Sequence, residues 1–137
     1  MNILLVEDNP GDVELFREAL SHRELLIHVV EDGVDAISFL SQKGAYANMP
    51  PPALVVLDIN LPRKNGHEVL AEIRADPRLT ALPVVMFTTS DYRKDIIKGY
   101  QAHVSAYVTK PGSASQYRAA VKEIESFWLS LAKLPNA

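Results

Sequence analysis

The chain has 137 residues, of which 47% are apolar and 23% charged, a composition typical of one globular domain and not of a disordered segment. It contains no cysteine, which excludes disulfides, thiolate nucleophiles and cysteine-bound zinc and favours a reducing cytoplasm. The formal net charge of −3 argues against a nucleic acid as the main partner. Because residues 1–8 are not basic and every apolar run is only as long as a strand, we expect neither a secretory signal nor a membrane span.

Short apolar runs alternate along the chain with segments whose apolar residues recur at helical spacing. The runs that predict strands are residues 3–6, 27–30, 53–57, 84–87 and, more weakly, 105–109. The segments that predict helices are about residues 10–20, 33–40, 66–76, 92–100 and 115–131. Runs that are apolar on both faces are typical of parallel strands with helices on both sides of the sheet. The sequence therefore predicts an α/β fold with a doubly wound, five-stranded parallel sheet.

Two segments fall outside this alternating pattern. Residues 42–52, which include three consecutive prolines, predict one long loop before the third strand, with nothing in it that indicates chemistry. The last helix is longer than covering the sheet requires. We therefore expect residues 1–125 to form the domain and residues 126–137 to extend its last helix, with no output domain.

Polar side chains follow four of the five predicted strands. Glu7 and Asp8 follow the first strand, Asp58 the third, Thr88 the fourth and Lys110 the fifth. In an open parallel sheet, ligands bind outside the carboxyl ends of the strands. One polar residue at a strand end usually serves only the turn, but complementary groups at four strand ends favour a functional site.

The residue types indicate a metal and a phosphate. Three crowded carboxylates repel one another unless a cation joins them, and oxygen ligands without His or Cys favour Mg²⁺ or Mn²⁺. Magnesium also binds phosphate oxygens, which Lys110 and Thr88 can contact. Because no glycine-rich phosphate loop occurs, we do not expect the phosphate of a nucleotide. A carboxylate can itself become an aspartyl phosphate, and Asp58 has the central position for this role.

Four motifs at these strand ends resemble the receiver domains of bacterial response regulators over about residues 2–125. The motifs are Val6-Glu7-Asp8-Asn9, Leu57-Asp58-Ile59-Asn60-Leu61-Pro62 with Asn65-Gly66, Phe87-Thr88-Thr89-Ser90 and Tyr107-Val108-Thr109-Lys110-Pro111. The long loop before Pro50 and the tail at residues 127–135 resemble, more narrowly, response regulators that are paired with bacterial and cyanobacterial phytochrome kinases. The sequence differs from the family at Gly112, where a large apolar residue is common, and at His103, where a small residue is usual.

The resemblance implies a flavodoxin-like receiver fold with strand order 2-1-3-4-5 and a role in a two-component phosphorelay. A sensor histidine kinase, of the phytochrome type, would transfer a phosphoryl group to Asp58 in the presence of Mg²⁺, with Mn²⁺ as an alternative. Asp58 and Asp8 would bind the metal directly, Glu7 mainly through water and Asn60 through its backbone carbonyl.

The same resemblance implies roles for the residues around the phosphoacceptor. Thr88 and Lys110 would hold the phosphoryl oxygens, and Tyr107 would be the aromatic switch that turns inward when Thr88 is drawn to the phosphate. Asn60 and Ser90 flank the site at the two variable positions that tune hydrolysis in this family.

Two other functions compete with a phosphorylation-dependent receiver. A metal-dependent phosphohydrolase with an aspartyl-phosphate intermediate usually needs a second acid two residues after the nucleophile, where this chain has Asn60. An interaction module independent of phosphorylation would be favoured if the acidic pair or Lys110 were missing. We therefore expect a cytoplasmic phosphoprotein that is not an enzyme and signals to an unidentified protein through changed contacts.

Apolar residues recur along the last predicted helix at spacings of four and three, as in a helix that packs on a partner. The stripe consists of Tyr117, Val121, Ile124, Trp128 and Leu131. If the helix continues to Leu134, the patch formed by Phe127, Trp128 and Leu131 projects beyond the sheet. We expect a twofold homodimer through the fourth helix, fifth strand and fifth helix; the alternative is a stripe that folds back on its own domain.

Overall fold

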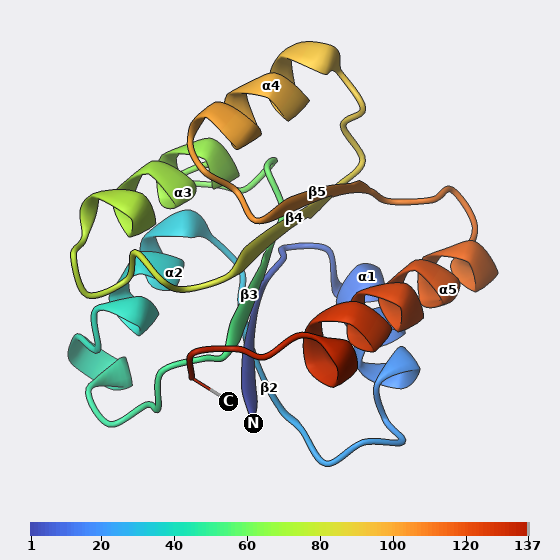
Figure 1. The fold of residues 1–137 in the computed structure, drawn as a ribbon, viewed down its shortest axis with the longest axis horizontal. Coiled ribbons are helices and arrows are strands. Elements are labelled where there is room, and N and C mark those ends of the chain that lie inside the picture. Colours follow the sequence, from blue (N-terminus) through green and yellow to red (C-terminus); the bar gives the residue numbers. More distant parts are fainter. Residues whose placement is uncertain (137) are drawn as a thin grey trace.

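A computed structural model describes residues 1–136 of the protein. Five parallel strands form one sheet in the order β2-β1-β3-β4-β5, with helices on both faces (Figure 1). The strands are β1 (Asn2–Val6), β2 (Leu26–Val30), β3 (Leu54–Leu57), β4 (Val84–Thr88) and β5 (Ala106–Thr109). The helices are α1 (Pro10–Ala19), α2 (Gly33–Leu40), α3 (Gly66–Ala75), α4 (Arg93–Gln101) and α5 (Ala114–Ile124), with the 3₁₀-helix η1 (Gly44–Tyr46) and the π-helix η2 (Glu125–Leu131). The predicted fold class and strand order are confirmed.

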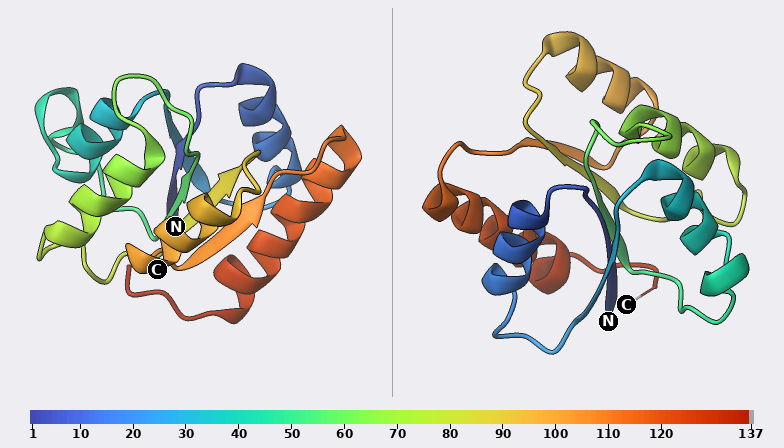
Figure 2. Two further views of the ribbon diagram at one scale, coloured as in Figure 1. Left: turned by 90° about the horizontal axis from the view of Figure 1, so that it is seen from above. Right: turned by 180° about the vertical axis from the view of Figure 1, so that it is seen from behind.

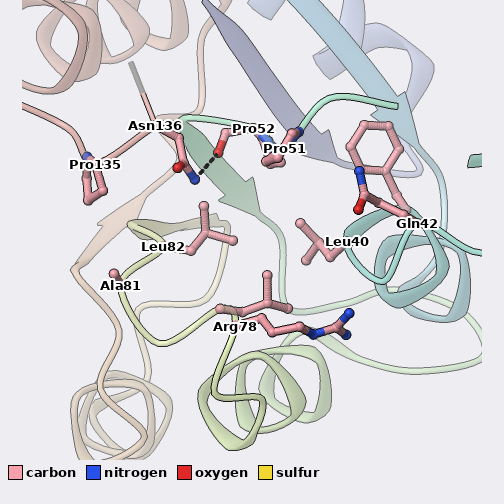
Figure 3. Close-up of a pocket in the computed structure, with 11 residues that line it drawn as sticks. Leu40, Gln42, Pro51, Pro52, Arg78, Ala81, Leu82, Pro135 and Asn136 are labelled. Atoms are coloured by element: carbon pink, nitrogen blue, oxygen red, sulfur yellow. Dashed lines mark hydrogen bonds between the residues drawn. The ribbon is translucent and has the colours of Figure 1, made fainter. Parts of the chain in front are cut away.

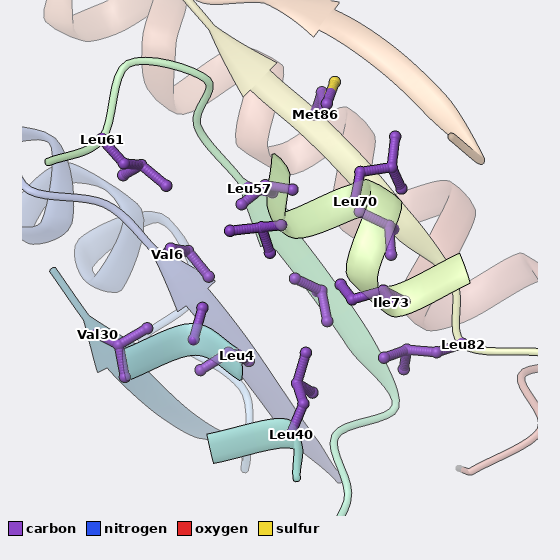
Figure 4. Close-up of a cluster of buried hydrophobic side chains, with 14 of the residues drawn as sticks. Leu4, Val6, Val30, Leu40, Leu57, Leu61, Leu70, Ile73, Leu82 and Met86 are labelled. Atoms are coloured by element: carbon purple, nitrogen blue, oxygen red, sulfur yellow. The ribbon is translucent and has the colours of Figure 1, made fainter. Parts of the chain in front are cut away.

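Two apolar layers explain why the strands are apolar on both faces. Helices α2, α3 and α4 lie on one side of the sheet, and α1 and α5 lie on the other (Figures 1 and 2). Within β3, Val55 and Leu57 belong to the cluster beneath α2 and α3 (Figure 4), whereas Leu54 and Val56 belong to the cluster beneath α1 and α5. Because successive strand residues point to opposite faces, a sheet covered on both sides needs apolar residues at every position.

Polar residues fix where α1, α2, α3 and α5 begin after their strands, whereas the side chain of Tyr92 at the start of α4 makes no such bond. The side chains that accept a hydrogen bond from the backbone N–H three residues later belong to Asn9, Asp32, Asn65 and Ser113. Each satisfies one of the amide groups that have no partner in the first helical turn. Pro10 and Gly66 occupy the first helical positions of α1 and α3, so the chain enters both helices a few residues after the predicted functional side chains.

The backbone at His103 shows why the receiver family usually has a small residue at this position. Its φ of 67° lies in the left-handed region, which glycine adopts without a steric cost, and this is the position where the family usually has a small residue. Arg74 Nε donates a hydrogen bond of 2.9 Å to the carbonyl oxygen of His103. This bond supports the turn that leads from α4 into β5.

The end of the chain differs from the predicted continuous helix. After α5 the backbone widens into the π-helix η2, in which the N–H of Ala132 bonds to the carbonyl of Phe127 at 2.7 Å, and Ala132 itself is extended. The wider turn changes which residues face the core, so Leu129 is buried and Leu131 is 72% exposed. Continuation of the helix to Leu134 is therefore wrong, and Leu134 packs back on the core beneath α5.

The long loop and the C-terminal tail enclose a pocket of about 230 Å³ at the edge where the strands begin (Figure 3). Pro51 and Pro52 line it from the loop and Pro135 from the tail, and Asn136 Nδ2 donates a 3.4 Å hydrogen bond to the carbonyl of Pro52. This pocket lies opposite the edge where the predicted functional residues follow the strands. In residues 1–136 no helix combines the length and the apolar character needed to cross a membrane.

Gly66 is needed because α3 starts against the backbone of the loop that follows β3. A Cβ at this position would lie 2.2 Å from the carbonyl oxygen of Asp58, whereas a Cβ at Gly112 would meet nothing within 4 Å. We expect Gly66→Ala to lower the free energy of unfolding by about 1–3 kcal/mol, the usual cost of overpacking. Gly112→Ala, the control, should change it by less than about 0.5 kcal/mol. Urea denaturation measures both, and equal midpoints would contradict this close approach.

Candidate functional site

The carboxyl ends of four neighbouring strands bring the predicted site residues to one edge of the sheet. Glu7 and Asp8 follow β1, Asp58 follows β3, Thr88 ends β4 and Lys110 follows β5. Backbone hydrogen bonds continue the strand pairing into the site: the N–H of Asp58 bonds to Val6 at 3.1 Å and the N–H of Lys110 to Thr88 at 2.6 Å. The sheet thus places the groups that were singled out in the sequence next to one another.

Three carboxylates form a cluster that can hold a metal ion. Glu7, Asp8 and Asp58 each offer an oxygen atom, and these atoms all lie within 4.8 Å of one another. Glu7 and Asp58 are buried while Asp8 is exposed, so the cluster opens to solvent on the side of Asp8. A set of carboxylate oxygens open to water suits Mg²⁺, which keeps several water ligands, and Mn²⁺, which takes similar ligands. Asn60 lies exposed in the loop that follows Asp58.

Lys110 is buried between these carboxylates. Its Nζ donates hydrogen bonds to Asp58 Oδ2 at 3.0 Å and to Asp12 Oδ2 at 2.8 Å, and it also bonds to Glu7. Burial by itself lowers the pKa of Lys110, but the hydrogen bonds to Asp12 and Glu7 and the charge of Asp58 outweigh it and raise the pKa above its ordinary value. The ammonium is therefore charged at neutral pH.

Glu7 is the most deeply buried carboxylate of the cluster, with 2% of its surface exposed. Burial raises its pKa to about 7, although the hydrogen bonds from Lys110 and from the N–H of Asn9, at 3.1 Å, favour the charged form. Near neutral pH Glu7 is therefore partly protonated, and a cation that binds to the cluster competes with this proton.

The residues predicted to form the switch are connected by hydrogen bonds. Ser90 N–H lies 3.5 Å from Oγ1 of the fully buried Thr88, and the hydroxyl of Tyr107 donates to the carbonyl of Ser90 at 2.8 Å. Ser90 Oγ in turn donates to Asp95 on α4 at 2.6 Å, and Asp95 also accepts from Nε2 of His67 at 3.2 Å. A movement of Thr88 can therefore reach both β5 and α4 through Ser90.

Two residues near the site were missed at the sequence level. Asp12 in the first turn of α1 contacts Lys110, and the hydroxyl of Tyr117 on α5 donates to the backbone carbonyl of Asp12 at 3.2 Å. In the sequence Asp12 is an ordinary acidic residue in a first helical turn, and Tyr117 an ordinary member of the apolar stripe. The one signal in the sequence was the spacing of four residues between Asp8 and Asp12, which could have indicated that Asp12 lies near the site.

Residues 3–122 match the family model described as the response regulator receiver domain, and the chain belongs to this family. It is therefore a two-component response regulator, whose partner is a histidine kinase and whose metal cofactor is Mg²⁺. The prediction of the receiver family from four strand-end motifs is confirmed.

Within this family the chain is similar to cyanobacterial proteins. It is 46% identical to response regulator Rcp1 of Synechocystis sp. over 139 residues, which cover 98% of this chain and 93% of that protein. The crystal structure of the phosphorylated cyanobacterial phytochrome response regulator RcpA matches with a TM-score of 0.96 at 48% identity, covering 98% of this chain and 97% of that one. The Mn²⁺-bound form of Rcp1 matches with a TM-score of 0.94 at 44% identity, covering 98% of both chains.

The pKa of Glu7 leads to a prediction about metal binding. Because Glu7 is largely protonated below pH 7, Mg²⁺ binding at pH 6.5 should release a fraction of a proton, and the affinity for Mg²⁺ should fall as the pH falls through 7. Calorimetric titration in two buffers of different ionisation enthalpy measures the protons released. The variant Glu7→Gln has no proton to lose and should release almost none. Equal proton release by this variant and the natural protein would show that the proton comes from another group.

Proposed function

We propose that Asp58 is the phosphoacceptor of this response regulator. The observation that supports it best is the position of Asp58 at the centre of the strand-end cluster, between the acidic pair and the ammonium of Lys110 at 3.0 Å. The N–H of Ile59 donates to Asp58 Oδ1 at 2.7 Å, which fixes the direction of the carboxylate. A carboxylate that is oriented, close to a cation site and next to a charged donor has what an aspartyl-phosphate nucleophile needs.

In the proposed transfer, an oxygen of Asp58 forms a bond to phosphorus while the bond from phosphorus to the kinase histidine breaks. The electron pair of the broken bond stays on the histidine nitrogen, and the imidazole, protonated on its other nitrogen, leaves as a neutral group. Asp58 and Asp8 would hold the metal directly, Glu7 mainly through water and Asn60 through its backbone carbonyl. When bound, Mg²⁺ offsets the charge of the carboxylates and of the phosphoryl oxygens.

Thr88 and Lys110 hold the phosphoryl oxygens in this proposal, the first as a hydroxyl donor and the second as an ammonium. Tyr107 responds as the switch, because its hydroxyl and the Oγ1 of Thr88 both bond to the backbone of Ser90. Asn60 is exposed and Ser90 half-buried, and both have access to the water that hydrolyses the phosphoaspartate. The amide of Asn60 cannot act as a general acid that protonates an alkoxide leaving group. This supports a signalling receiver over a phosphohydrolase that acts on separate substrates.

We further infer that the kinase is of the phytochrome type and that the signal passes in the cytoplasm to a downstream protein. The relatives support the first inference, because RcpA is a cyanobacterial phytochrome response regulator at 48% identity over nearly the full chain. The lack of cysteines is in keeping with a reducing compartment.

We infer that residues 1–125 are the receiver unit and that residues 126–137 are an extension that serves a homodimer; Ala137 lies outside the described residues. Phe127 is 51% and Leu131 72% exposed, which supports a role in an interface. Phe127 and Trp128 stack edge to face at 5.0 Å beside a groove of about 460 Å³ between β5 and α5. Trp128 is only half-exposed because it packs partly on its own core, so Phe127 and Leu131 are the main exposed contacts.

The phosphoacceptor is tested by labelling with acetyl phosphate and Mg²⁺. Asp58→Asn should take up no base-labile phosphate, because an amide cannot attack phosphorus. Asp76→Asn, the same change at the opposite edge of the sheet, should label like the natural protein. Base-labile label on Asp58→Asn at the natural level would contradict the assignment. Rapid release of phosphate without stable label would favour the hydrolase, and no label on the natural protein would favour a passive module.

The dimer is tested by sedimentation at high micromolar concentration. Phe127→Asp with Leu131→Asp should give a folded monomer, because both side chains are exposed and two charges at an apolar interface cost several kcal/mol when buried. Ser126→Asp, which adds a charge at another exposed position of η2, should leave the dimer intact. A natural protein that sediments as a monomer with and without a phosphoryl mimic would rule the dimer out.

A further inference from the structure

Asp12 contacts the phosphate-binding lysine from outside the acidic cluster. Its Oδ2 accepts a hydrogen bond of 2.8 Å from Lys110 Nζ, slightly shorter than the 3.0 Å bond to Asp58. An ammonium has three N–H groups, and Glu7, Asp12 and Asp58 provide three acceptors. All the hydrogen-bonding capacity of Lys110 is therefore used before any phosphoryl oxygen arrives.

Asp12 is held in place independently of Lys110. Its backbone N–H donates to Oδ1 of Asn9, the N-cap residue of α1, at 3.1 Å. Its backbone carbonyl accepts from the hydroxyl of Tyr117 at 3.2 Å, and the Tyr117 ring lies against Phe87 with centroids 5.1 Å apart. Because two elements fix the backbone of Asp12, its carboxylate has little freedom to follow Lys110 away from α1.

The three acceptors of Lys110 differ in what else they do. Asp58 receives the phosphoryl group, and Glu7 belongs to the carboxylate cluster that can hold the metal. Asp12 lies outside that cluster, and its side chain is 24% exposed. Of the three acceptors, Asp12 is therefore the one that lies on α1 and outside the candidate metal cluster.

We propose that Asp12 is a positioning residue that holds Lys110 against α1. The hydrogen bond between Asp12 and Lys110 must then break or lengthen when the ammonium bonds to a phosphoryl oxygen. The proposal rests on the function proposed for Asp58. Asp12 then slows phosphorylation of Asp58 and keeps the unphosphorylated state stable.

The first experiment measures how fast Asp58 is labelled by acetyl phosphate at saturating Mg²⁺. In this reaction a bond from Asp58 oxygen to phosphorus forms, the phosphorus–oxygen bond of the donor breaks, and its electron pair leaves with acetate. Asp12→Asn and Asp12→Ala should label about three- to tenfold faster, the range expected for the net loss of one hydrogen bond. Glu14→Gln, which removes an exposed carboxylate from the same helix, should label at the natural rate. Unchanged rates for both Asp12 variants would overturn the proposal.

A double-mutant cycle separates restraint of Lys110 from two other effects of the Asp12 charge, repulsion of the anionic donor and stabilisation of the first helical turn. In a Lys110→Ala background, Asp12→Asn should leave the labelling rate unchanged, because there is no ammonium to restrain. Acceleration of the same size in both backgrounds would overturn the proposal, since the charge would then act directly on the donor or on α1.

A second measurement does not depend on phosphorylation. The restrained ammonium of Lys110 should give a slowly exchanging ¹⁵N-ammonium NMR signal in the natural protein and in Glu14→Gln. Asp12→Ala should broaden this signal beyond detection or speed its exchange several-fold. A signal that is unchanged in Asp12→Ala would overturn the restraint. If the natural protein fails to label on Asp58 while the NMR signal responds as expected, the function proposed for Asp58 is wrong and the restraint of Lys110 stands.

Discussion

The buried ion cluster around Lys110 is the interaction on which the functional edge of the sheet depends. Carboxylates from β1, β3 and α1 converge on one ammonium that follows β5, so four elements distant in the sequence are held by one charge. Three carboxylates in partly buried surroundings repel one another, and the ammonium offsets only part of that charge. The remaining negative charge is what attracts a divalent cation, and metal binding and phosphate binding are for this reason properties of the same cluster.

Close backbone packing keeps the loop after β3 in place beside this cluster. A Cβ at Gly33 would lie 2.0 Å from the carbonyl oxygen of Lys64, so the loop rests directly on the start of α2. Arg63, with φ at 67°, bonds to Asp32 at 3.0 Å from the same loop. These contacts fix the loop that contains Asn60 without using any residue of the metal cluster. The arrangement separates the residues that set the shape of the site from those that supply its charge.

The C-terminal helix η2 packs on its own domain through some residues and exposes apolar side chains through others. Glu125 at the start of η2 is buried, with His22 at 2.9 Å and Arg23 at 3.6 Å, and Arg23 also donates to the carbonyl of Leu129 at 3.3 Å. These contacts hold the wide helix against the loop after α1. They bury Leu129 and leave Leu131 exposed.

The sequence by itself determined the fold class, the bounds of the five strands and of α1–α4 to about one residue, and the strand ends that supply the site, because period, apolar runs and caps are local properties. It indicated Glu7, Asp8, Asp58, Thr88 and Lys110, since parallel strands bring their carboxyl ends to one edge. Only the tertiary structure decided that Asp12 reaches Lys110 and that Tyr117 reaches the backbone of Asp12. Nothing local distinguishes a helical Asp that faces a buried ammonium from one that faces water. The π-helical turn was also decided there, since burial of Leu129 and Glu125 outweighed the regular spacing of the α-helical stripe.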